Sequence, residues 1–229
     1  MHAIVLAGGF GTRLQSVVSD VPKPMALVGG RPFLEILLCH LERLGFDRVT
    51  MSVGYLSHLI VNHFGPKFGG MQLTYAVEPA PLGTGGAVVL AQRECADHHV
   101  FVFNGDTYLD FDARAVEALW RRKGNPIGMA CQVGDTARYG RLLVEGDRVR
   151  GFSEKGASGP GLINAGAYLL DLRDLAAWPE GVKFSLEQDY LVPAATTREI
   201  NCYADTENFV DIGVPDDYFR AEAVIVRRI

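Results

Sequence analysis

Near the N-terminus, three glycines and two cations are arranged in a way that suits the binding of phosphate. Gly8, Gly9 and Gly11 follow a short apolar stretch, and their backbone N–H groups can turn toward a ligand because no Cβ blocks them. Arg13 adds a planar, permanently charged guanidinium that matches phosphate oxygens. Lys23 stands between two prolines that stiffen the chain around it. The combination favours a phosphate site over the alternative, a tight strand–helix connection with surface charges.

Two aspartates far apart in the sequence could hold a metal ion. Asp106 closes an Asn-Gly-Asp segment after the apolar residues 100–103, and Asp211 follows an apolar pair. Because both follow strand-like stretches, both can project from strand ends toward one cleft. Carboxylate oxygens are hard ligands that Mg²⁺ takes together with substrate phosphates. The alternatives are a simple Asn-Gly-Asp turn and, for Asp211, the cap of a following helix.

Several other chemistries are excluded by what the sequence lacks. It contains no G-x-x-x-x-G-K-[ST] phosphate loop, no H-E-x-x-H zinc helix and no G-x-S-x-G nucleophile turn. The glycine spacing also misses the dinucleotide fingerprint, since Leu14 stands where the third glycine would be. The cysteines are too far apart for a CxxC or zinc-ribbon site, and we expect buried, reduced hydrophobes at Cys39, Cys95, Cys131 and Cys202.

Composition and charge narrow the class of protein further. The chain has 229 residues, of which 48% are hydrophobic and 21% charged, an ordinary globular mixture. Its formal net charge is −5 without a basic cluster, which argues against a nucleic-acid partner. The longest unbroken apolar runs are about five residues, whereas a membrane span needs about 20. No targeting segment is visible, so we expect a cytoplasmic protein that does not associate with membranes.

The apolar pattern of the first half predicts strands that alternate with helices. Residues 3–7 are uniformly apolar and end at a glycine pair, which is typical of the centre of a parallel sheet covered on both faces. Pro32 opens and Gly45 stops the first expected helix, and Ser57 and Asp112 are expected N-caps. The alternation predicts a mostly parallel sheet with right-handed crossovers, with strands at 3–7, 48–53, 73–77 and 100–103 and helices at 32–44, 57–64, 85–93 and 112–123.

The second half has a different pattern, in which strands are joined by short connections. Short connections force antiparallel pairing, so we expect a smaller mixed or antiparallel lobe from residues 127–133, 140–144, 149–152 and 162–170. Ser185 and Gln188 fit a capping box at the start of a helix that Pro193 ends, and Pro215 starts a C-terminal helix. No long linker separates the halves, so we predict a single domain with lobes at about 1–125 and about 126–229.

These residues together resemble the sugar-1-phosphate nucleotidyltransferases, the nucleotide-sugar pyrophosphorylases. The glycine loop with its arginine and the Lys-Pro pair are typical of that family, and further motifs follow in the family's order through nearly the whole chain. They are the base-binding loop 78–87, the metal-aspartate motifs 104–106 and 210–213, the sugar-phosphate lysine motif 152–155 and the sugar-binding motif 163–166. The resemblance implies a Rossmann-like nucleotidyltransferase fold, with a nucleotide-binding lobe followed by a sugar-binding lobe.

The family's reaction is attack of a sugar 1-phosphate oxygen on the α-phosphorus of a nucleoside triphosphate, with release of pyrophosphate. By resemblance, Arg13, Lys23 and Asp106 carry the catalysis, and Asp106 and Asp211 hold Mg²⁺. The residues implied in nucleotide binding are Leu6, Ala7, Gly8, Gly9, Gly11, Thr12, Glu78, Gly83, Thr84 and Gly85. Those implied in sugar-phosphate binding are Gly140, Glu154, Lys155, Asn164 and Gly166. The role of Glu187 stays open, because a capping role at the start of its helix also explains it.

The choice of base and sugar rests on Glu78 and on the compact length of the chain. Guanine offers two N–H donors on its pairing edge, which an ionised carboxylate accepts, so we favour GTP over UTP. The chain resembles the D-glycero-D-manno-heptose 1-phosphate guanylyltransferases, which implies GDP-heptose as the product and a role in polysaccharide biosynthesis. The alternatives are a mannose-1-phosphate guanylyltransferase, a uridylyltransferase acting on an amino-sugar 1-phosphate, and a catalytically silent regulatory subunit. We expect a monomer or a homodimer.

Overall fold

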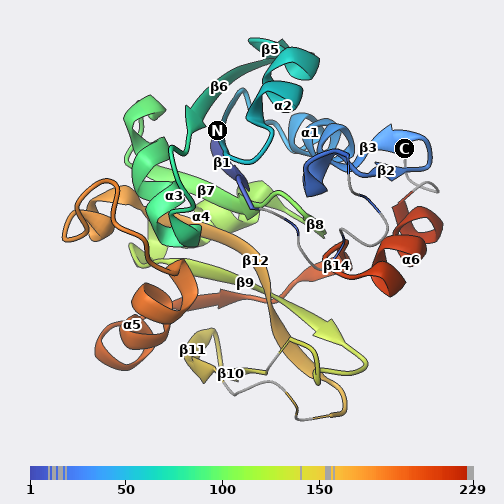
Figure 1. Cartoon of the computed structure of the whole chain (residues 1–229). Helices are drawn as coiled ribbons and strands as arrows, with labels where there is room; N and C mark the ends of the chain where they lie inside the picture. The colour runs from blue at the N-terminus through green and yellow to red at the C-terminus, as the bar shows by residue number, and fades with distance from the viewer. Residues whose placement is uncertain are drawn as a thin grey trace.

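A ten-stranded β-sheet forms the centre of the molecule. The computed structural model describes residues 1–9, 11, 14, 18, 20–139, 141–152, 156 and 158–225. The strands of the sheet follow the order β10-β11-β13-β9-β12-β7-β1-β4-β6-β5, so the sheet continues without a break from the first half of the chain into the second (Figure 1). Within the described residues, no helix is long and apolar enough to cross a membrane.

The first half of the chain supplies the parallel part of the sheet. It consists of β1 (His2–Ala7), β4 (Arg48–Val53), β6 (Met71–Val77) and β7 (His99–Asn104). β1 lies between β7 and β4 and is buried along most of its length, as the uniformly apolar residues 3–7 predict. It starts beside Met1, whose ammonium contacts Asp47 Oδ1 at 2.7 Å, and it ends at the glycine loop. The short strand β5 (Lys67–Phe68) closes this edge.

The second half of the chain extends the same sheet. β12 (Gly161–Asp171) pairs antiparallel with both β7 and β9 (Ile127–Val133), and it therefore joins the two halves. β13 (Asn201–Tyr203) runs parallel to β9, and β11 (Arg148–Phe152) and β10 (Leu142–Glu145) complete the far edge. The expected fold class is confirmed, because a parallel part is continued by a smaller mixed part.

Helices cover both faces of the sheet (Figure 1). On one face, α1 (Phe33–Arg43), α2 (Ser57–Phe64) and α4 (Ala113–Lys123) bury their apolar sides in one core cluster. On the other face, α3 (Gly83–Ala91), a π-helix at Leu186–Leu191 and α5 (Val192–Thr197) pack in a second cluster. Asp112 caps α4 as predicted, since its Oδ1 accepts the N–H groups of Arg114 at 2.9 Å and Ala115 at 3.1 Å.

Two small antiparallel strand pairs lie outside the main sheet. β8 (Thr107–Phe111) pairs with β14 (Thr206–Asp211), and β2 (Leu27–Val28) pairs with β3 (Arg31–Pro32). The C-terminal helix α6 (Pro215–Ile225) follows β14. Residues from β14, α6 and α1 share a third core cluster, so these elements form one packed unit beside the sheet.

Two local expectations are wrong. Ser57 does not cap α2, because the residue before the helix is Leu56, which has φ 51° and no side-chain capping bond. Pro193 does not end its helix, because the π-helix continues directly into α5 and Pro193 occupies the first turn of α5. Pro193 has no N–H, so one hydrogen bond of the helical ladder is missing where the π-helix changes to α5, yet the helix continues through it. The helix expected at 85–93 begins slightly earlier, at Gly83.

Candidate active site

A cavity of about 230 Å³ opens at the carboxyl end of β1. The end of β1, the glycine loop, the Lys-Pro segment and the two aspartate motifs form its walls. The lining residues are Leu6, Ala7, Gly9, Gly11, Lys23, Pro24, Asp106 and Gly213. Ligands in open α/β sheets bind at the carboxyl ends of parallel strands, so the position suits a substrate site.

Lys23 lies between the two aspartates. Its Nζ forms an ion pair with Asp106 and lies 4.0 Å from Asp211 Oδ1. The Lys23 side chain is only 10% exposed, so its ammonium is surrounded by these two carboxylates rather than by water. Burial and the neighbouring charge of Asp106 raise the pKa of Asp211. The two carboxylates therefore repel each other, and the ammonium between them offsets part of that repulsion.

The pairing of β8 with β14 brings the two aspartates together. Asp106 lies immediately before β8, Asp211 ends β14, and Thr107 and Asp211 are direct partners in the register. The N–H of Ile212 also donates to the carbonyl oxygen of Asp106 at 3.0 Å. The sequence indicated a common cleft but not this pairing. The β-branched and aromatic residues of both segments were the available signal.

Glycines allow the segments around the cavity to approach closely. The Gly105 N–H donates to the Leu6 carbonyl oxygen at 2.9 Å, and a Cβ on Gly105 would lie 2.7 Å from that oxygen. Gly11 has φ +60°, and a Cβ there would lie 2.7 Å from the Cβ of Lys23. A Cβ on Gly213 would lie 2.9 Å from Lys23 Nζ. Real Cβ contacts are longer, so Lys23 would have to shift if Gly11 or Gly213 carried a side chain, and Leu6 would have to shift if Gly105 did.

Glu78 lies against the glycine loop, just beyond the end of β6. Its Oε1 accepts the Ser52 hydroxyl at 3.1 Å, and its Oε2 accepts the Leu82 N–H at 3.1 Å. A Cβ on Gly8 would lie 2.0 Å from Oε1. Ser52, which positions this carboxylate, was not among the residues predicted from the sequence. A polar residue near the end of a strand was the only signal in the sequence.

The glycines of the expected base-binding loop have a packing role that the sequence did not reveal. Gly83 has φ +69°, and a Cβ there would lie 2.5 Å from the carbonyl oxygen of Phe184. A Cβ on Gly85 would lie 2.1 Å from the Phe184 ring, and the Gly85 N–H donates to the Phe184 carbonyl oxygen at 3.0 Å. Glycine is therefore needed at both positions because Phe184, which precedes the π-helix, packs directly against them. Thr84, between them, is half-buried.

The expected sugar-binding residues of β12 lie beside the first aspartate motif. β12 is irregular between Asn164 and Tyr168, where its register with β9 shifts. Gly166 has φ +67°, and a Cβ there would lie 2.3 Å from Asn104 Nδ2. The Asn164 side chain is half-buried, and its Oδ1 accepts the Gly166 N–H at 3.2 Å. Asn164 and Gly166 thus lie on β12, next to β7, the strand that leads to Asp106.

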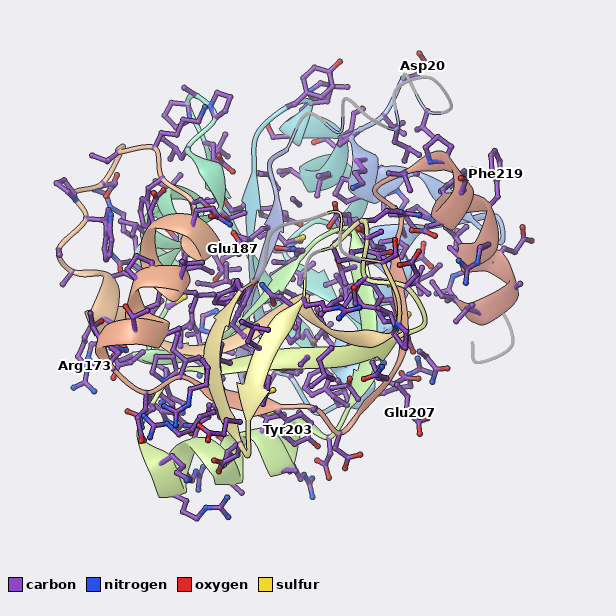
Figure 2. The ribbon with its side chains drawn as sticks, turned by 90° about the horizontal axis from the view of Figure 1, so that it is seen from below. Asp20, Arg173, Glu187, Tyr203, Glu207 and Phe219 are labelled. Carbon is purple, nitrogen blue, oxygen red and sulfur yellow. The ribbon has the colours of Figure 1, made fainter. Side chains whose placement is uncertain are left out.

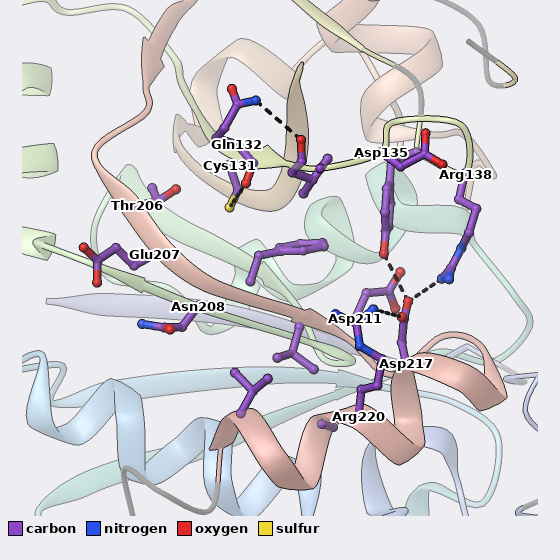
Figure 3. A pocket seen from close by; sticks show the side chains of 17 residues that line it. Cys131, Gln132, Asp135, Arg138, Thr206, Glu207, Asn208, Asp211, Asp217 and Arg220 are labelled. Atoms are coloured by element: carbon purple, nitrogen blue, oxygen red, sulfur yellow. Dashed lines mark hydrogen bonds and ion pairs between the residues drawn. The ribbon is translucent and has the colours of Figure 1, made fainter. Parts of the chain in front are cut away.

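A larger cavity of about 820 Å³ lies between β9, β14 and α6 (Figure 3). Asp217 lies in its wall with a side chain that is 10% exposed. Arg138 forms an ion pair with Asp217, the Tyr139 hydroxyl donates to it at 3.1 Å, and Arg220 lies 3.5 Å away. Burial and the charge of Asp217 raise the pKa of Tyr139 to about 12. These contacts fasten α6, which follows the strand of Asp211, to the connection between β9 and β10.

The donor set at Asp106 and Asp211 suits a hard metal ion that substrate oxygens help to bind. In the part of the chain that the structure describes, no group of three or more His, Cys, Asp and Glu side chains could enclose a metal. Mg²⁺ commonly takes one or two carboxylates and completes its shell with phosphates and water. The remaining expected site residues, Thr12, Arg13, Gly140, Glu154 and Lys155, lie outside the described residues.

The four cysteines differ in burial. All of them are free thiols; Cys131 and Cys202 are buried, and Cys39 and Cys95 are partly exposed. Burial raises the pKa of Cys95 and of Cys202 to about 11. Such thiols stay protonated and unreactive at neutral pH. The expected burial is confirmed for Cys131 and Cys202, whereas Cys39 and Cys95 are only partly buried.

Known proteins are similar to this chain over nearly its full length. Residues 2–228 match the family model described as nucleotidyl transferase. A D-glycero-alpha-D-manno-heptose 1-phosphate guanylyltransferase from Aneurinibacillus thermoaerophilus is 36% identical over 223 residues, which are 97% of this chain and 97% of the relative. One from Campylobacter jejuni subsp. jejuni serotype O:2 is 37% identical over 221 residues, 96% of this chain and 97% of the relative.

A solved structure gives the same result for the fold. The crystal structure of HddC from Yersinia pseudotuberculosis superimposes with a TM-score of 0.87 at 34% sequence identity, covering 97% of this chain and 98% of that chain. Family model, relatives and structure all match over nearly the full length. They confirm the resemblance that the motifs indicated, and the chain belongs to the nucleotidyl transferase family.

Proposed function

We propose that the protein transfers GMP from GTP to D-glycero-α-D-manno-heptose 1-phosphate, giving GDP-heptose and pyrophosphate. The observation that carries the proposal is the cluster of Lys23, Asp106 and Asp211 beside the glycine loop. Two relatives of nearly the same length are named for this activity, and a related solved structure is a complex with GMP-PN. As part of the proposal, we place the enzyme in the cytoplasm and in polysaccharide biosynthesis.

The chemistry requires positioning and charge neutralisation rather than a covalent intermediate. The phosphate oxygen of a sugar 1-phosphate is already ionised, so no general base has to remove a proton. Lys23 would lie across the α-phosphate and the sugar phosphate and hold the two polyanions in line. Arg13, at the end of the glycine loop, would offset the charge that develops on the leaving pyrophosphate.

Asp106 and Asp211 would hold Mg²⁺. The raised pKa of Asp211 supports this assignment, because two adjacent carboxylates favour a cation between them. The bound ion would neutralise phosphate charge and polarise the α-phosphorus. The close contacts of Gly213 and Gly105 would keep both carboxylates in place while the substrates bind.

The two substrates would bind over the two halves of the sheet. The chain from Leu6 to Gly11, with Thr12, would follow the nucleotide phosphates, and the loop with Gly83, Thr84 and Gly85 would flank the base. Glu78 has about four acceptor positions, of which Ser52 and Leu82 use two, so two remain for the N–H donors of guanine. The sugar phosphate would contact Gly140, Glu154, Lys155, Asn164 and Gly166.

A matrix of nucleotides and sugar phosphates tests the proposal. Pyrophosphate release is measured with Mg²⁺, GTP or UTP, and each of heptose 1-phosphate, mannose 1-phosphate and an amino-sugar 1-phosphate. We expect the highest kcat/KM for GTP with the heptose. A maximum with mannose 1-phosphate, or with UTP and an amino sugar, would replace the substrate assignment. Binding of GTP without turnover in every combination would instead indicate a silent regulatory subunit.

A further inference from the structure

Glu187 connects the candidate base loop to the candidate sugar site through a chain of hydrogen bonds. It lies in the π-helix Leu186–Leu191, which packs on the sheet (Figure 2). Its Oε2 accepts the Thr84 hydroxyl at 2.9 Å, and its Oε1 accepts the Tyr168 hydroxyl at 3.0 Å. Tyr168 in turn accepts a hydrogen bond from the Asn164 amide at 2.7 Å. One carboxylate thus links α3 to β12.

A capping role does not account for these contacts. The first turn of the π-helix is capped by other groups, since Ser185 Oγ accepts the Gln188 N–H at 3.1 Å and Asp189 Oδ2 accepts the Ser185 N–H at 2.7 Å. The Ser185 hydroxyl also donates to Glu187 at 3.2 Å. The two other donors to the Glu187 carboxylate come from segments that are distant in the sequence. The Glu187 carboxylate therefore holds the π-helix, α3 and β12 together rather than capping the end of the helix.

The carboxylate fixes the direction of every bond in this chain, because an ionised carboxylate only accepts. The Thr84 hydroxyl must donate to Glu187, so its oxygen can only accept, and it accepts a backbone N–H of the π-helix at 2.9 Å. The Tyr168 hydroxyl must also donate, so its oxygen accepts from Asn164. This orientation turns the carbonyl oxygen of the Asn164 amide toward the Gly166 N–H. Tyr168 is 1% exposed, so water does not compete for its hydroxyl.

We propose that Glu187 is a positioning residue that couples the nucleotide site to the sugar-phosphate site. The inference rests on the proposed function, in which Thr84 faces the nucleotide and Asn164 faces the sugar. A nucleotide that orders Thr84 also orders Asn164 through the shared carboxylate, so the first substrate increases the affinity for the second. The same bonds present Thr84 to the nucleotide as a hydrogen-bond acceptor only.

Calorimetry measures this coupling directly. The α,β-methylene analogue of GTP, which cannot release pyrophosphate, is titrated with Mg²⁺ in the presence and absence of saturating heptose 1-phosphate. The analogue should bind about fivefold more tightly, or better, when the sugar phosphate is present. Glu187→Gln places an N–H donor against at least one of the three hydroxyls that donate to this side chain, so the ratio should fall to near one. Asp189→Asn, in the same helix, is the matched control and should keep the wild-type ratio.

Two further variants keep the test decisive even if Glu187→Gln does not fold. Tyr168→Phe lies outside the base loop, yet it should weaken binding of the GTP analogue alone. Thr84→Val lies outside the sugar site, yet it should weaken binding of heptose 1-phosphate alone. A wild-type ratio in Glu187→Gln, or the absence of both cross-effects, overturns the coupling. If the wild-type protein turns over no nucleotide with any sugar phosphate, the proposed function falls and the coupling with it.

Discussion

Glu78 is held by two hydrogen bonds at the edge of the glycine loop, and this fixed position bears on the choice of nucleotide. Glu78→Gln keeps the size of the side chain but replaces one acceptor by a donor that opposes a guanine N–H. We expect kcat/KM for GTP relative to UTP to fall by about 10- to 100-fold, the cost of a charged hydrogen bond. Initial rates with both nucleotides measure the ratio. Glu94→Gln, at an exposed position, is the control, and an unchanged ratio in Glu78→Gln would refute the base-reading role.

Asp211 is expected to reduce stability at the pH where it would serve catalysis. Because its pKa is raised in the folded protein, its stabilising contribution is present below the ordinary carboxyl pKa and is lost as the pH rises through the raised value. Asp211→Asn should therefore raise the unfolding temperature at pH 7 and leave it unchanged near about pH 3. Turnover with Mg²⁺ should fall by orders of magnitude.

Thermal melts at the two pH values and a pyrophosphate assay check this prediction. Asp97→Asn removes an acid that is 43% exposed and pairs with Arg48, so it should alter both readouts little. A lower unfolding temperature of Asp211→Asn at pH 7 would show that the ammonium of Lys23 outweighs the repulsion from Asp106. Retained turnover would remove Asp211 from the proposed metal site.

At the scale of elements, Asp217 joins α6 to the connection between β9 and β10, and its two arginines allow a matched comparison. Arg138 is 45% exposed and forms a close ion pair, whereas Arg220 is 79% exposed and lies 3.5 Å away. Arg138→Met leaves a buried carboxylate poorly paired, which should lower the free energy of unfolding by about 1–3 kcal/mol. Arg220→Met should change it by less than about 0.5 kcal/mol. Equal urea midpoints for the two variants would contradict this account.

The sequence pattern predicted those helices and strands whose bounds depend on residues close together in the chain. The strand at 48–53, the helix at 57–64 and the strand at 127–133 have the expected bounds, because apolar spacing sets them. The pairing of β8 with β14 joins residues about 100 positions apart, as does the contact of Gly83 with Phe184, and no local pattern reports such contacts. The π-helix and its continuation through Pro193 depend on packing against the sheet for the same reason.

The contacts of the candidate site also separate into those that the sequence could predict and those that it could not. The meeting of Lys23, Asp106 and Asp211 follows from a general rule about strand ends, so it could be expected from sequence. The links of Glu187 to Thr84 and Tyr168 could not, because each crosses between separate segments of the chain. A local capping pattern at Ser185 was the only visible feature there, and it explained the helix but not the carboxylate.

At the scale of the whole molecule, a histidine in the central sheet makes the stability of the protein depend on pH. His2 is 4% exposed in β1, and its Nε2 shares a hydrogen bond with the Thr50 hydroxyl at 2.9 Å. Burial, and then the charge of Arg48, lower the pKa of His2 to about 4. A lowered histidine pKa gives stability that is present above the ordinary pKa of 6.5 and is lost as the pH falls toward about 4.

Replacement of His2 should remove this part of the acid sensitivity. Between about pH 6.5 and about pH 4, the wild type should lose roughly 3 kcal/mol more than His2→Gln, the equivalent of the change in pKa. Urea unfolding at a series of pH values measures the difference. His58→Gln, at an exposed position, should follow the wild-type curve. If the free energy of unfolding depended on pH in the same way for the wild type and His2→Gln, protonation of His2 would not destabilise the folded protein.

The direction of β1 has a practical consequence for experiments on this protein. The strand runs from His2 to the glycine loop, so its first residue lies about 20 Å from the cavity, at the opposite end of the strand. A tag attached before His2 would lie beside Asp47, whose side chain is 65% exposed. A fluorophore or a sensor chip coupled there would leave the substrate edge open, and surface-based binding measurements could report on both ligands without blocking either.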